Sequence, residues 1–231
     1  MSGLRVAEVF HDPVLIFSVL FSLKIAVATL LIHAVIGPLL GWALSRPGWP
    51  GRGLLDLLIT LPMVLPPIVL GFFLLVLLGR RSWLGGWLDA SLGISFVFSV
   101  WGVLLASVLV GLPLVVKPIE AAITALPPSL TEAGRTLGHG EWSIFFHVIL
   151  PNLRAVLATG LLLATARSLG EVGVTLMLGG NIVGRTNTIS LEIYNGVTQG
   201  DFARATLLSA GLGLFSALVI VTLRLRGPVR A

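Results

Sequence analysis

Long apolar runs dominate the chain and alternate with short polar or charged segments. Because a helix rises about 1.5 Å per residue, crossing a membrane takes roughly 20 apolar residues. Five runs reach that length, at about 14–44, 57–79, 90–116, 155–178 and 205–223. The pattern therefore predicts an all-α integral membrane protein, a single transmembrane domain over residues 1–231 with five spans.

The polar segment 127–151 separates the third run from the fourth. Two prolines open it, and we expect a helix to follow with Ser129 or Thr131 as its cap and Glu132 in its first turn. Gly138 and Gly140 should end this helix, since glycine readily adopts the left-handed cap conformation. The rest of the segment is apolar on most faces, which predicts a second helix buried against other parts of the chain.

A second polar segment, 179–204, is rich in Gly, Asn and Thr. It is too long for a tight turn, and we expect a loop with a short helix at about 189–197. Its first part offers hydrogen-bond donors without nearby acids, from Asn181, Arg185 and Thr186 around Gly184. Such donors suit an oxyanion, although an ordinary solvated loop explains them as well.

Composition agrees with a membrane protein. Hydrophobic residues make up 56% of the chain and charged residues 11%, whereas a soluble domain carries about 25% charged residues. The net charge of +5 comes mostly from basic residues that flank apolar runs. Membrane topology and contact with lipid headgroups explain these residues better than binding of nucleic acid, so we expect no nucleic-acid partner. The N-terminus carries Glu8 and Asp12 where a signal peptide would be basic, so we expect no such peptide.

The basic residues also predict an orientation, because they are enriched in cytoplasmic loops. One side of the five-span arrangement holds Arg46, Arg52, Lys117, Arg135, Arg154, Arg224, Arg226 and Arg230. The other holds Arg5, Arg80, Arg81, Arg185 and Arg204. The first side is therefore predicted to be cytoplasmic, with the C-terminus inside, the N-terminus outside, and 179–204 facing outward.

Enzyme signatures are missing from the sequence. It has no GxxxxGK[ST] nucleotide-binding loop, no HExxH metal motif and no GxSxG nucleophile motif. It has no cysteine, and its acidic residues are few and scattered, so we expect no catalytic residues and no metal site. The protein is predicted to move something across a membrane or to act as a scaffold there.

Two features inside the runs break their apolar character. Pro62, Pro66 and Pro67 lie in the second run, where they predict either a plain kink or a bent helix beside a pathway. Arg167 and Glu171 lie four residues apart in the fourth run, on one face of the expected helix. Two opposite charges there either form an ion pair that locks helices together or border a conduction pathway.

Two other polar side chains lie in the first run. We expect Lys24 to extend towards the outer interface, and His33 to form a hydrogen bond between helices rather than to titrate.

The segment 127–151 resembles the EAA motif of ABC importer permeases, E-A-A-x3-G-x9-I-x-L-P, with the spacing matched throughout. Gly134 replaces the second alanine and Val148 replaces isoleucine, both small apolar changes. In that family the segment is a coupling helix that sits in a cleft of the ATPase subunit. The resemblance assigns ATPase coupling to Glu132, Ala133, Gly134, Gly138, Val148, Leu150 and Pro151.

From about residue 22 to 223 the chain is similar to the molybdate permease subunit of the molybdate, tungstate and sulfate branch. The stretches LPMVLPPIVLGF, ARSLGEVG and GGNIVGRTNTISLEIY carry this likeness. Tungstate and molybdate have the same charge and shape, so the residues do not separate them, and a sulfate permease or a scaffold without transport stays open.

The family implies an assembly and a mechanism. Two copies of the chain would form the pathway as a homodimer, with two ABC ATPase subunits inside and a molybdate-binding protein outside. ATP and Mg would be held by the ATPase, and this chain would bind no cofactor. Residues Asn181, Gly184, Arg185 and Thr186 would face the binding protein, and ATP-driven closure of the ATPases would open the spans outward.

Overall fold

The structure, a computed structural model, describes residues 11–225 of the 231. Arg5, Glu8, Arg226 and Arg230, on which the predicted orientation and the argument about a signal peptide partly rest, lie outside the described residues. The described part contains helices, turns and loops but no strand. In chain order the helices are α2 (Pro13–Ser45), α3 (Arg52–Val64), α4 (Pro67–Leu78), α5 (Trp83–Leu92), α6 (Val100–Thr124), α7 (Pro128–Thr136), α8 (Glu141–Ile144), the π-helix η1 (Phe145–Ile149), α9 (Leu150–Asn152), α10 (Arg154–Leu169), α11 (Gly173–Gly179), α12 (Ile189–Thr198) and α13 (Phe202–Leu225).

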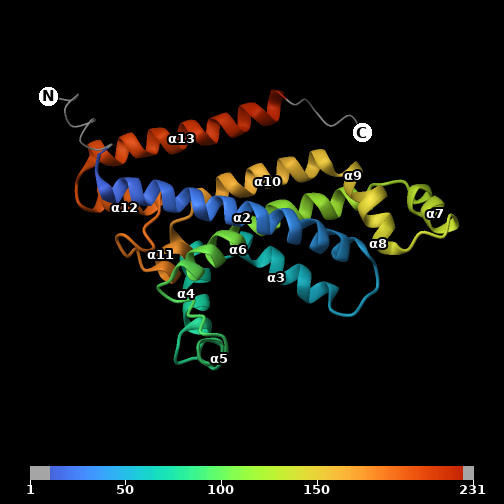
Figure 1. The fold of residues 1–231 in the computed structure, drawn as a ribbon, viewed down its shortest axis with the longest axis horizontal. Coiled ribbons are helices and arrows are strands. Elements are labelled where there is room, and N and C mark those ends of the chain that lie inside the picture. The colour runs from blue at the N-terminus through green and yellow to red at the C-terminus, as the bar shows by residue number, and fades with distance from the viewer. Residues whose placement is uncertain (1–10, 226–231) are drawn as a thin grey trace.

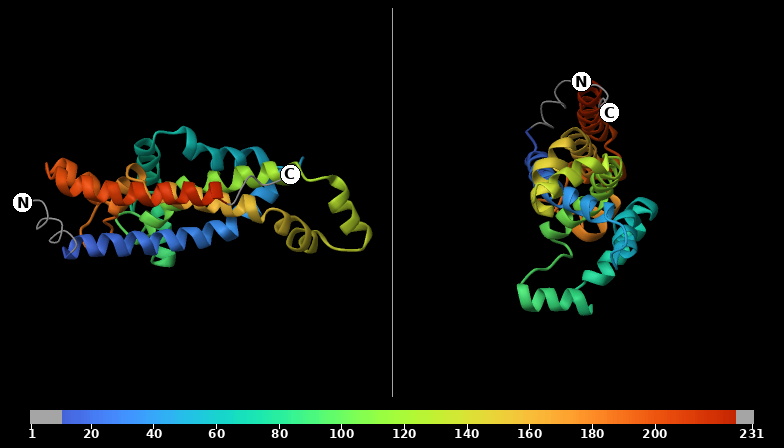
Figure 2. Two further views of the ribbon diagram at one scale, coloured as in Figure 1. Left: turned by 90° about the horizontal axis from the view of Figure 1, so that it is seen from above. Right: turned by 90° about the vertical axis from the view of Figure 1, so that its right-hand side faces the viewer.

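Three long helices, α2, α6 and α10, form the centre of an elongated bundle, with α13 beside α10 and α12 (Figure 1). Helices α7 and α8 lie at one end of the long axis, and α12 lies at the other. Figure 2 shows that α4 and α5 project sideways from the bundle. The segment with the EAA spacing and the donor-rich loop are therefore at opposite ends of the molecule.

The contact between α2 and α6 depends on small residues. Asp12 caps α2 by accepting the Val14 N–H at 2.9 Å, and the helix then runs for 33 residues, about 50 Å. A Cβ at Gly37 would lie 2.4 Å from Val115 Cγ1, and one at Gly41 would lie 2.5 Å from Ile119 Cγ2. Small residues let membrane helices approach closely where no hydrophobic effect drives them together, and here they place α2 directly on α6.

The second apolar run is broken into two helices. Helix α3 contains Pro62 and ends at Val64, whereas Pro66 and Pro67 stand at the cap and first position of α4. Proline lacks an N–H and fits the first turn of a helix, so the pair Pro66–Pro67 ends one helix and starts another. The prolines therefore produce a break, which is more than the bent single helix expected from the sequence.

The third run, predicted at 90–116, is shifted towards the C-terminus. Helix α6 begins at Val100, where the Ser99 hydroxyl accepts the Gly102 N–H at 3.3 Å. It continues past Lys117 because that ammonium donates to Asp56 on α3 at 2.7 Å and to Glu120 at 2.6 Å. The charge that marked the end of the run in the sequence is thus paired, and the helix extends to Thr124.

The fourth run is also divided. Helix α10 ends at Leu169, and α11 begins at Gly173 after a short break. A Cβ at Gly173 would lie 2.8 Å from Pro67 Cβ, so α11 packs directly on the start of α4. The two broken runs thus meet at their breaks.

Two helices among residues 11–225, α2 and α6, are long and apolar enough to cross a membrane. The number rises to four if two bent pairs each count as one span: α4 with α5, bent by 58°, and Glu141–Asn152 with α10, bent by 74°. The apolar stretch Phe202–Leu218 of α13 is shorter. The count of five spans therefore stays a prediction.

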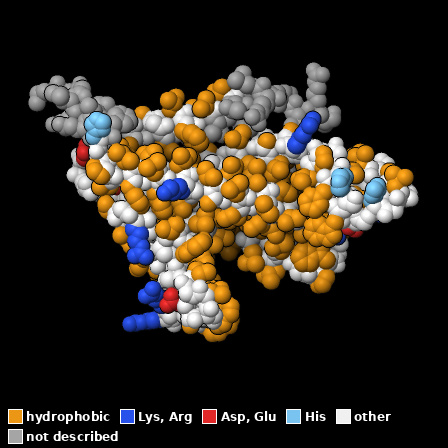
Figure 3. All heavy atoms as spheres, in the orientation of Figure 1, with side chains coloured by type: hydrophobic (Ala, Val, Ile, Leu, Met, Phe, Trp, Pro, Cys, Tyr) orange, Lys and Arg blue, Asp and Glu red, His pale blue; other side chains and the backbone are white. Residues whose placement is uncertain are grey.

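Much of the surface of α2 is apolar. Its exposed side chains include Leu20, Leu23, Val27, Leu31 and Val35, which recur every three or four residues along one face. Figure 3 shows hydrophobic side chains over most of the visible bundle, with many basic and acidic side chains towards its ends and around α4–α5. Lys24 is exposed on α2. His33 is fully buried, and its Nε2 lies 2.9 Å from the Val108 carbonyl of α6, which confirms the expected hydrogen bond between helices.

Candidate functional site

The segment 127–151 forms the two-helix element that the sequence predicts. Gly138 has φ +80°, and its N–H donates to the Arg135 carbonyl at 3.0 Å, so it ends α7 in the left-handed conformation as expected. The start differs: α7 begins at Pro128 with Pro127 as its cap residue, and neither Ser129 nor Thr131 caps it. Glu132 therefore lies beyond the first turn, and it is exposed.

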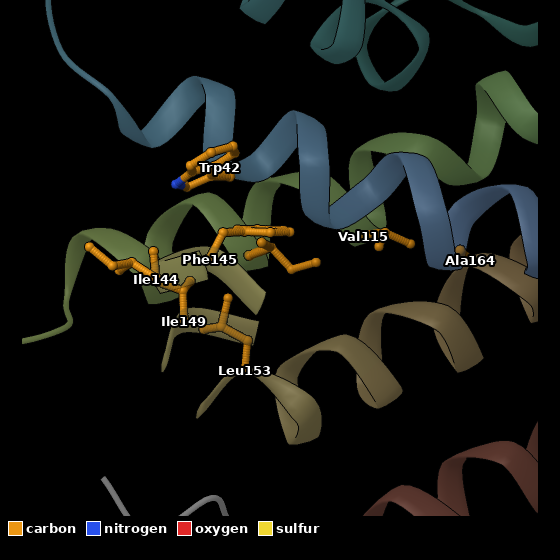
Figure 4. Close-up of a cluster of buried hydrophobic side chains, with 8 residues drawn as sticks. Trp42, Val115, Ile144, Phe145, Ile149, Leu153 and Ala164 are labelled. Atoms are coloured by element: carbon orange, nitrogen blue, oxygen red, sulfur yellow. The ribbon is translucent and has the colours of Figure 1, made fainter. Parts of the chain in front are cut away.

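The second half of the element is built into the end of the bundle. Phe145–Ile149 is a π-helix, in which the Leu150 N–H reaches back to the Phe145 carbonyl, and it leads into Pro151. Its buried side chains join a cluster with residues of α2, α6 and α10, as Figure 4 shows. The cluster consists of Trp42, Val115, Ile119, Ile144, Phe145, Ile149, Leu153 and Ala164. The expectation that this helix is buried is confirmed on this face.

The element also leaves large apolar side chains exposed, although Trp142 and Phe146 touch rings of the cluster. Leu137 is 77% exposed, Trp142 60% and Phe146 52%. Glu132 is exposed on the same two-helix element. Large exposed apolar side chains beside a charge are typical of a protein-binding surface.

Charged and aromatic contacts attach the element to the end of α2. Glu141 accepts from Arg46 Nη2 at 2.6 Å and from Arg135 Nε at 2.8 Å. The hydrogen bond from Arg135 and the two positive charges lower the pKa of Glu141 below its ordinary value. The Arg46 guanidinium also lies 3.9 Å from the centre of the Trp42 ring, and Trp42 packs against Phe145 at 4.6 Å. We call Arg46, Arg135 and Glu141 the ionic clamp.

The residues of the EAA spacing fall into two groups. Glu132, Ala133, Gly138 and Pro151 are exposed, while Val148 and Leu150 are half-buried, and Val148 packs on the cluster of Figure 4. Gly134 is buried, and a Cβ there would lie 2.9 Å from Ile144 Cγ1. Of the two residues that depart from the motif, Gly134 therefore lies where the two helices touch.

Arg167 and Glu171 form the ion pair that their spacing predicts, at 2.8 Å. They do not share a continuous helix, because α10 ends at Leu169. The Glu171 side chain is 2% exposed and also accepts the Val174 N–H at 2.9 Å, so it caps the first turn of α11. The pair thus fixes the break between α10 and α11.

The donor-rich loop is folded mainly on its own hydrogen bonds. Helix α12 occupies the position of the expected short helix. Thr186 is buried and donates to the Gly179 carbonyl at 2.7 Å, and Asn181 donates to Asn195 at 2.6 Å. Arg185 and Gly184 are exposed, and Gly184 has φ +73°. Among the donors predicted for an oxyanion, Asn181 and Thr186 use their side chains for hydrogen bonds within the loop. The Arg185 side chain makes no described hydrogen bond or ion pair.

Sequence reasoning did not identify the ionic clamp or the pairing of Lys117 with Asp56. The clamp joins positions 95 residues apart, and nothing local to Arg46 points to Glu141. No group of three or more His, Asp or Glu side chains in residues 11–225 is placed to hold a metal ion.

Residues 34–226 match the family described as binding-protein-dependent transport system inner membrane component. The chain belongs to this family. It is therefore a multi-pass inner-membrane protein and a channel component of a transporter, as the apolar helices of the permease also indicate.

Individual relatives agree with this family. The permease is 39% identical over 206 residues to the molybdenum transport system permease protein ModB of Escherichia coli K12, covering 87% of this chain and 90% of that protein. It is 36% identical over 199 residues to the sulfate transport system permease protein CysW of Synechocystis, covering 84% of this chain and 69% of that protein. A chain of a bacterial alginate ABC transporter, solved with its periplasmic protein, matches the fold with a TM-score of 0.73 at 18% identity over 96% of this chain and 80% of that one.

Proposed function

We propose that this chain is the permease subunit of an ATP-driven importer of molybdate. The observation that carries the proposal is its likeness to the molybdenum permease of Escherichia coli, which covers nearly the whole of both chains. The complete EAA spacing on an exposed two-helix element supports it, since that element offers a charged and apolar surface to a partner.

The proposed assembly is a homodimer of this chain with two ABC ATPase subunits and an external molybdate-binding protein. The exposed face of α7 and α8, with Glu132 and Trp142, would contact the ATPase on the cytoplasmic side. The loop with Arg185 would face the binding protein, and the N-terminus would lie outside. ATP and Mg would be bound by the ATPase, and no cofactor by this chain.

The mechanism follows from the anchoring of the two-helix element. Closure of the ATPases on ATP would draw the two coupling elements together, and the ionic clamp and aromatic packing would pass that displacement to α2. Hydrolysis would reverse it. The Arg167–Glu171 pair would keep α10 and α11 in a fixed relation during the change.

Sulfate is the second candidate substrate, because sulfate permeases are also similar to this chain. The chain spans a smaller share of the Synechocystis sulfate permease than of the molybdenum permease, which favours molybdate. Tungstate shares the charge and tetrahedral shape of molybdate and is expected to be carried as well.

The test is oxyanion-dependent ATPase activity of the permease, its ATPase and its binding protein reconstituted together in lipid. Molybdate and tungstate should stimulate hydrolysis and sulfate should not. Stimulation by sulfate alone would reject the proposed substrate but keep the importer. Failure of the permease to assemble with an ATPase would reject the importer itself.

A further inference from the structure

A hollow of about 380 Å³ lies between three loops of the donor-rich side of the molecule. The loops are the turn after α4, the connection from α5 to α6, and the connection from α11 to α12. Its lining residues are Arg80, Ser95, Val97, Phe98, Ser99 and Arg185. The volume is within the range of small-molecule sites in proteins, about 300–1,000 Å³.

The connection from α5 to α6 is fixed to the end of α11. The Phe98 N–H donates to the Leu178 carbonyl at 2.6 Å, and Phe98 itself has φ +56°, a conformation that a bulky residue rarely adopts. A Cβ at Gly180 would lie 2.5 Å from Phe98 Cδ1, so the ring lies directly on that glycine. These contacts hold one wall of the hollow against the loop that carries Arg185.

The backbone beside each arginine is also held. Next to Arg185, the Thr186 hydroxyl donates to the Gly179 carbonyl at 2.7 Å and accepts the Ile182 N–H at 3.0 Å. Next to Arg80, the Ser82 hydroxyl lies 2.8 Å from the Gly79 carbonyl and accepts the Gly85 N–H at 2.9 Å. Two arginines from distant parts of the sequence thus line one hollow, and each lies beside an ordered turn.

The charge of the hollow is positive. Arg185 pairs with no described acid, and Arg80 has a single, long contact with Asp89 at 3.6 Å, with both side chains well exposed. The Ser95 hydroxyl lines the hollow and has no hydrogen-bond partner among residues 11–225, whereas the Ser99 hydroxyl is used to cap α6. Guanidinium groups present several N–H donors in a plane and bind the oxygens of oxyanions well.

We propose that this hollow binds a tetrahedral oxyanion group through Arg80, Arg185 and Ser95, and that the transported anion contacts the permease first at this place. The identification of this oxyanion with the transported substrate rests on the proposed function. The exposure of Arg80 implies weak binding, which suits a site that must release its ligand. A phospholipid phosphate offers the same chemistry, and the experiment below distinguishes it from the free anion.

The experiment measures equilibrium binding of radiolabelled molybdate to the purified permease–ATPase complex in detergent, without the binding protein. Arg80→Ala and Arg185→Ala should each weaken binding by about tenfold, the factor expected for loss of a charged hydrogen bond. Arg81→Ala is the matched control, since Arg81 is the next residue but does not line the hollow. Asp89→Asn should strengthen binding, because it frees Arg80.

Equal weakening by all three arginine variants, or no binding by the wild-type complex, would overturn the proposal. A second measurement counts the phospholipid retained by the complex, by native mass spectrometry. Phospholipid that is lost from the Arg80→Ala, Arg185→Ala double variant, together with unchanged molybdate binding, would reassign the hollow to a lipid headgroup.

An error in the assignment of the hollow and an error in the proposed function give different results. If molybdate stimulates the ATPase of the full wild-type assembly but binds equally to all variants, only the hollow is wrong. If no oxyanion stimulates the full assembly, the proposed function is wrong.

Discussion

Gly134 and Ile144 touch so closely that a Cβ at position 134 would lie 2.9 Å from Ile144 Cγ1. Gly134 is in α7 and Ile144 ends α8, so this contact sets the distance between the two helices of segment 127–151, the proposed coupling element. The EAA motif has alanine at this position. Glycine at this position leaves room for the Ile144 side chain.

We expect Gly134→Ala to destabilise the coupling element by about 1–3 kcal/mol, because the added methyl group overpacks a well-filled contact. ATPase stimulation should fall while the permease stays in the membrane. The double variant Gly134→Ala, Ile144→Ala should lose less than the sum of the single variants, since the second change removes the contacting atom. Strictly additive effects on thermal unfolding in detergent would show that the contact is not the cause.

Gly138 tests the turn between α7 and α8. Its φ of +80° disfavours any residue with a Cβ, so Gly138→Val should cost roughly 1–2 kcal/mol and impair coupling. The control is Gly140→Val, because Gly140 has φ −70° and open space around it. Similar losses of transport in the two variants would show that the backbone conformation at Gly138 is unimportant.

Glu132 tests the proposed ATPase contact. Its side chain is exposed and makes no described ion pair, so Glu132→Arg should leave the fold intact while it reverses a charge on the docking surface. We expect the ATPase to be lost on co-purification, and Glu132→Gln to show a smaller defect. Normal co-purification and normal transport by Glu132→Arg would exclude this residue from the contact.

The ionic clamp predicts a pH dependence of stability. The pKa of Glu141 is lowered in the folded protein, so its stabilising contribution is present above the ordinary value of 4.5 and is lost as the pH falls below it. The side chain is 44% exposed, which limits the contribution to below about 1 kcal/mol. The thermal unfolding temperature should therefore fall slightly more between pH 7 and pH 4 in the wild type than in Glu141→Gln. An equal fall in both proteins would mean that the clamp contributes nothing to stability.

Measurements of stability and of transport in the same variants can decide whether Arg167 and Glu171 have a structural role or a role in the pathway. If the pair is structural, Arg167→Met should destabilise the protein, because it leaves the buried Glu171 carboxylate without its cation. Adding Glu171→Gln should then restore stability and transport together. Stable variants with slow transport would place the pair on the pathway instead.

The sequence predicted the two-helix element, the glycine that ends α7 and the short helix α12, whereas it placed the third run at 90–116 and α6 spans Val100–Thr124. It did not predict where the long runs break. Arg167 and Glu171 have the spacing of one continuous helix, so the sequence around Gly170 and Gly173 does not mark the end of a helix there. The break between α10 and α11 combines the Glu171 cap on α11 with the contact of Gly173 on Pro67, and the hollow is lined by Arg80 and Arg185 from distant loops.

Helix α2 is bonded at both of its ends. Near its C-terminus, Arg46 is bound to Glu141 of the coupling element. Near its N-terminus, the Ser18 hydroxyl is hydrogen-bonded to Asn187, and the Ser22 hydroxyl accepts the Ile189 N–H at 2.9 Å. A single helix of about 50 Å, with Pro38 in its interior, therefore joins the two-helix element to the loop that carries Arg185. We expect the two ends of the molecule to move together. A change of nucleotide on the proposed ATPase would then displace the loop that carries Arg185 through α2 alone.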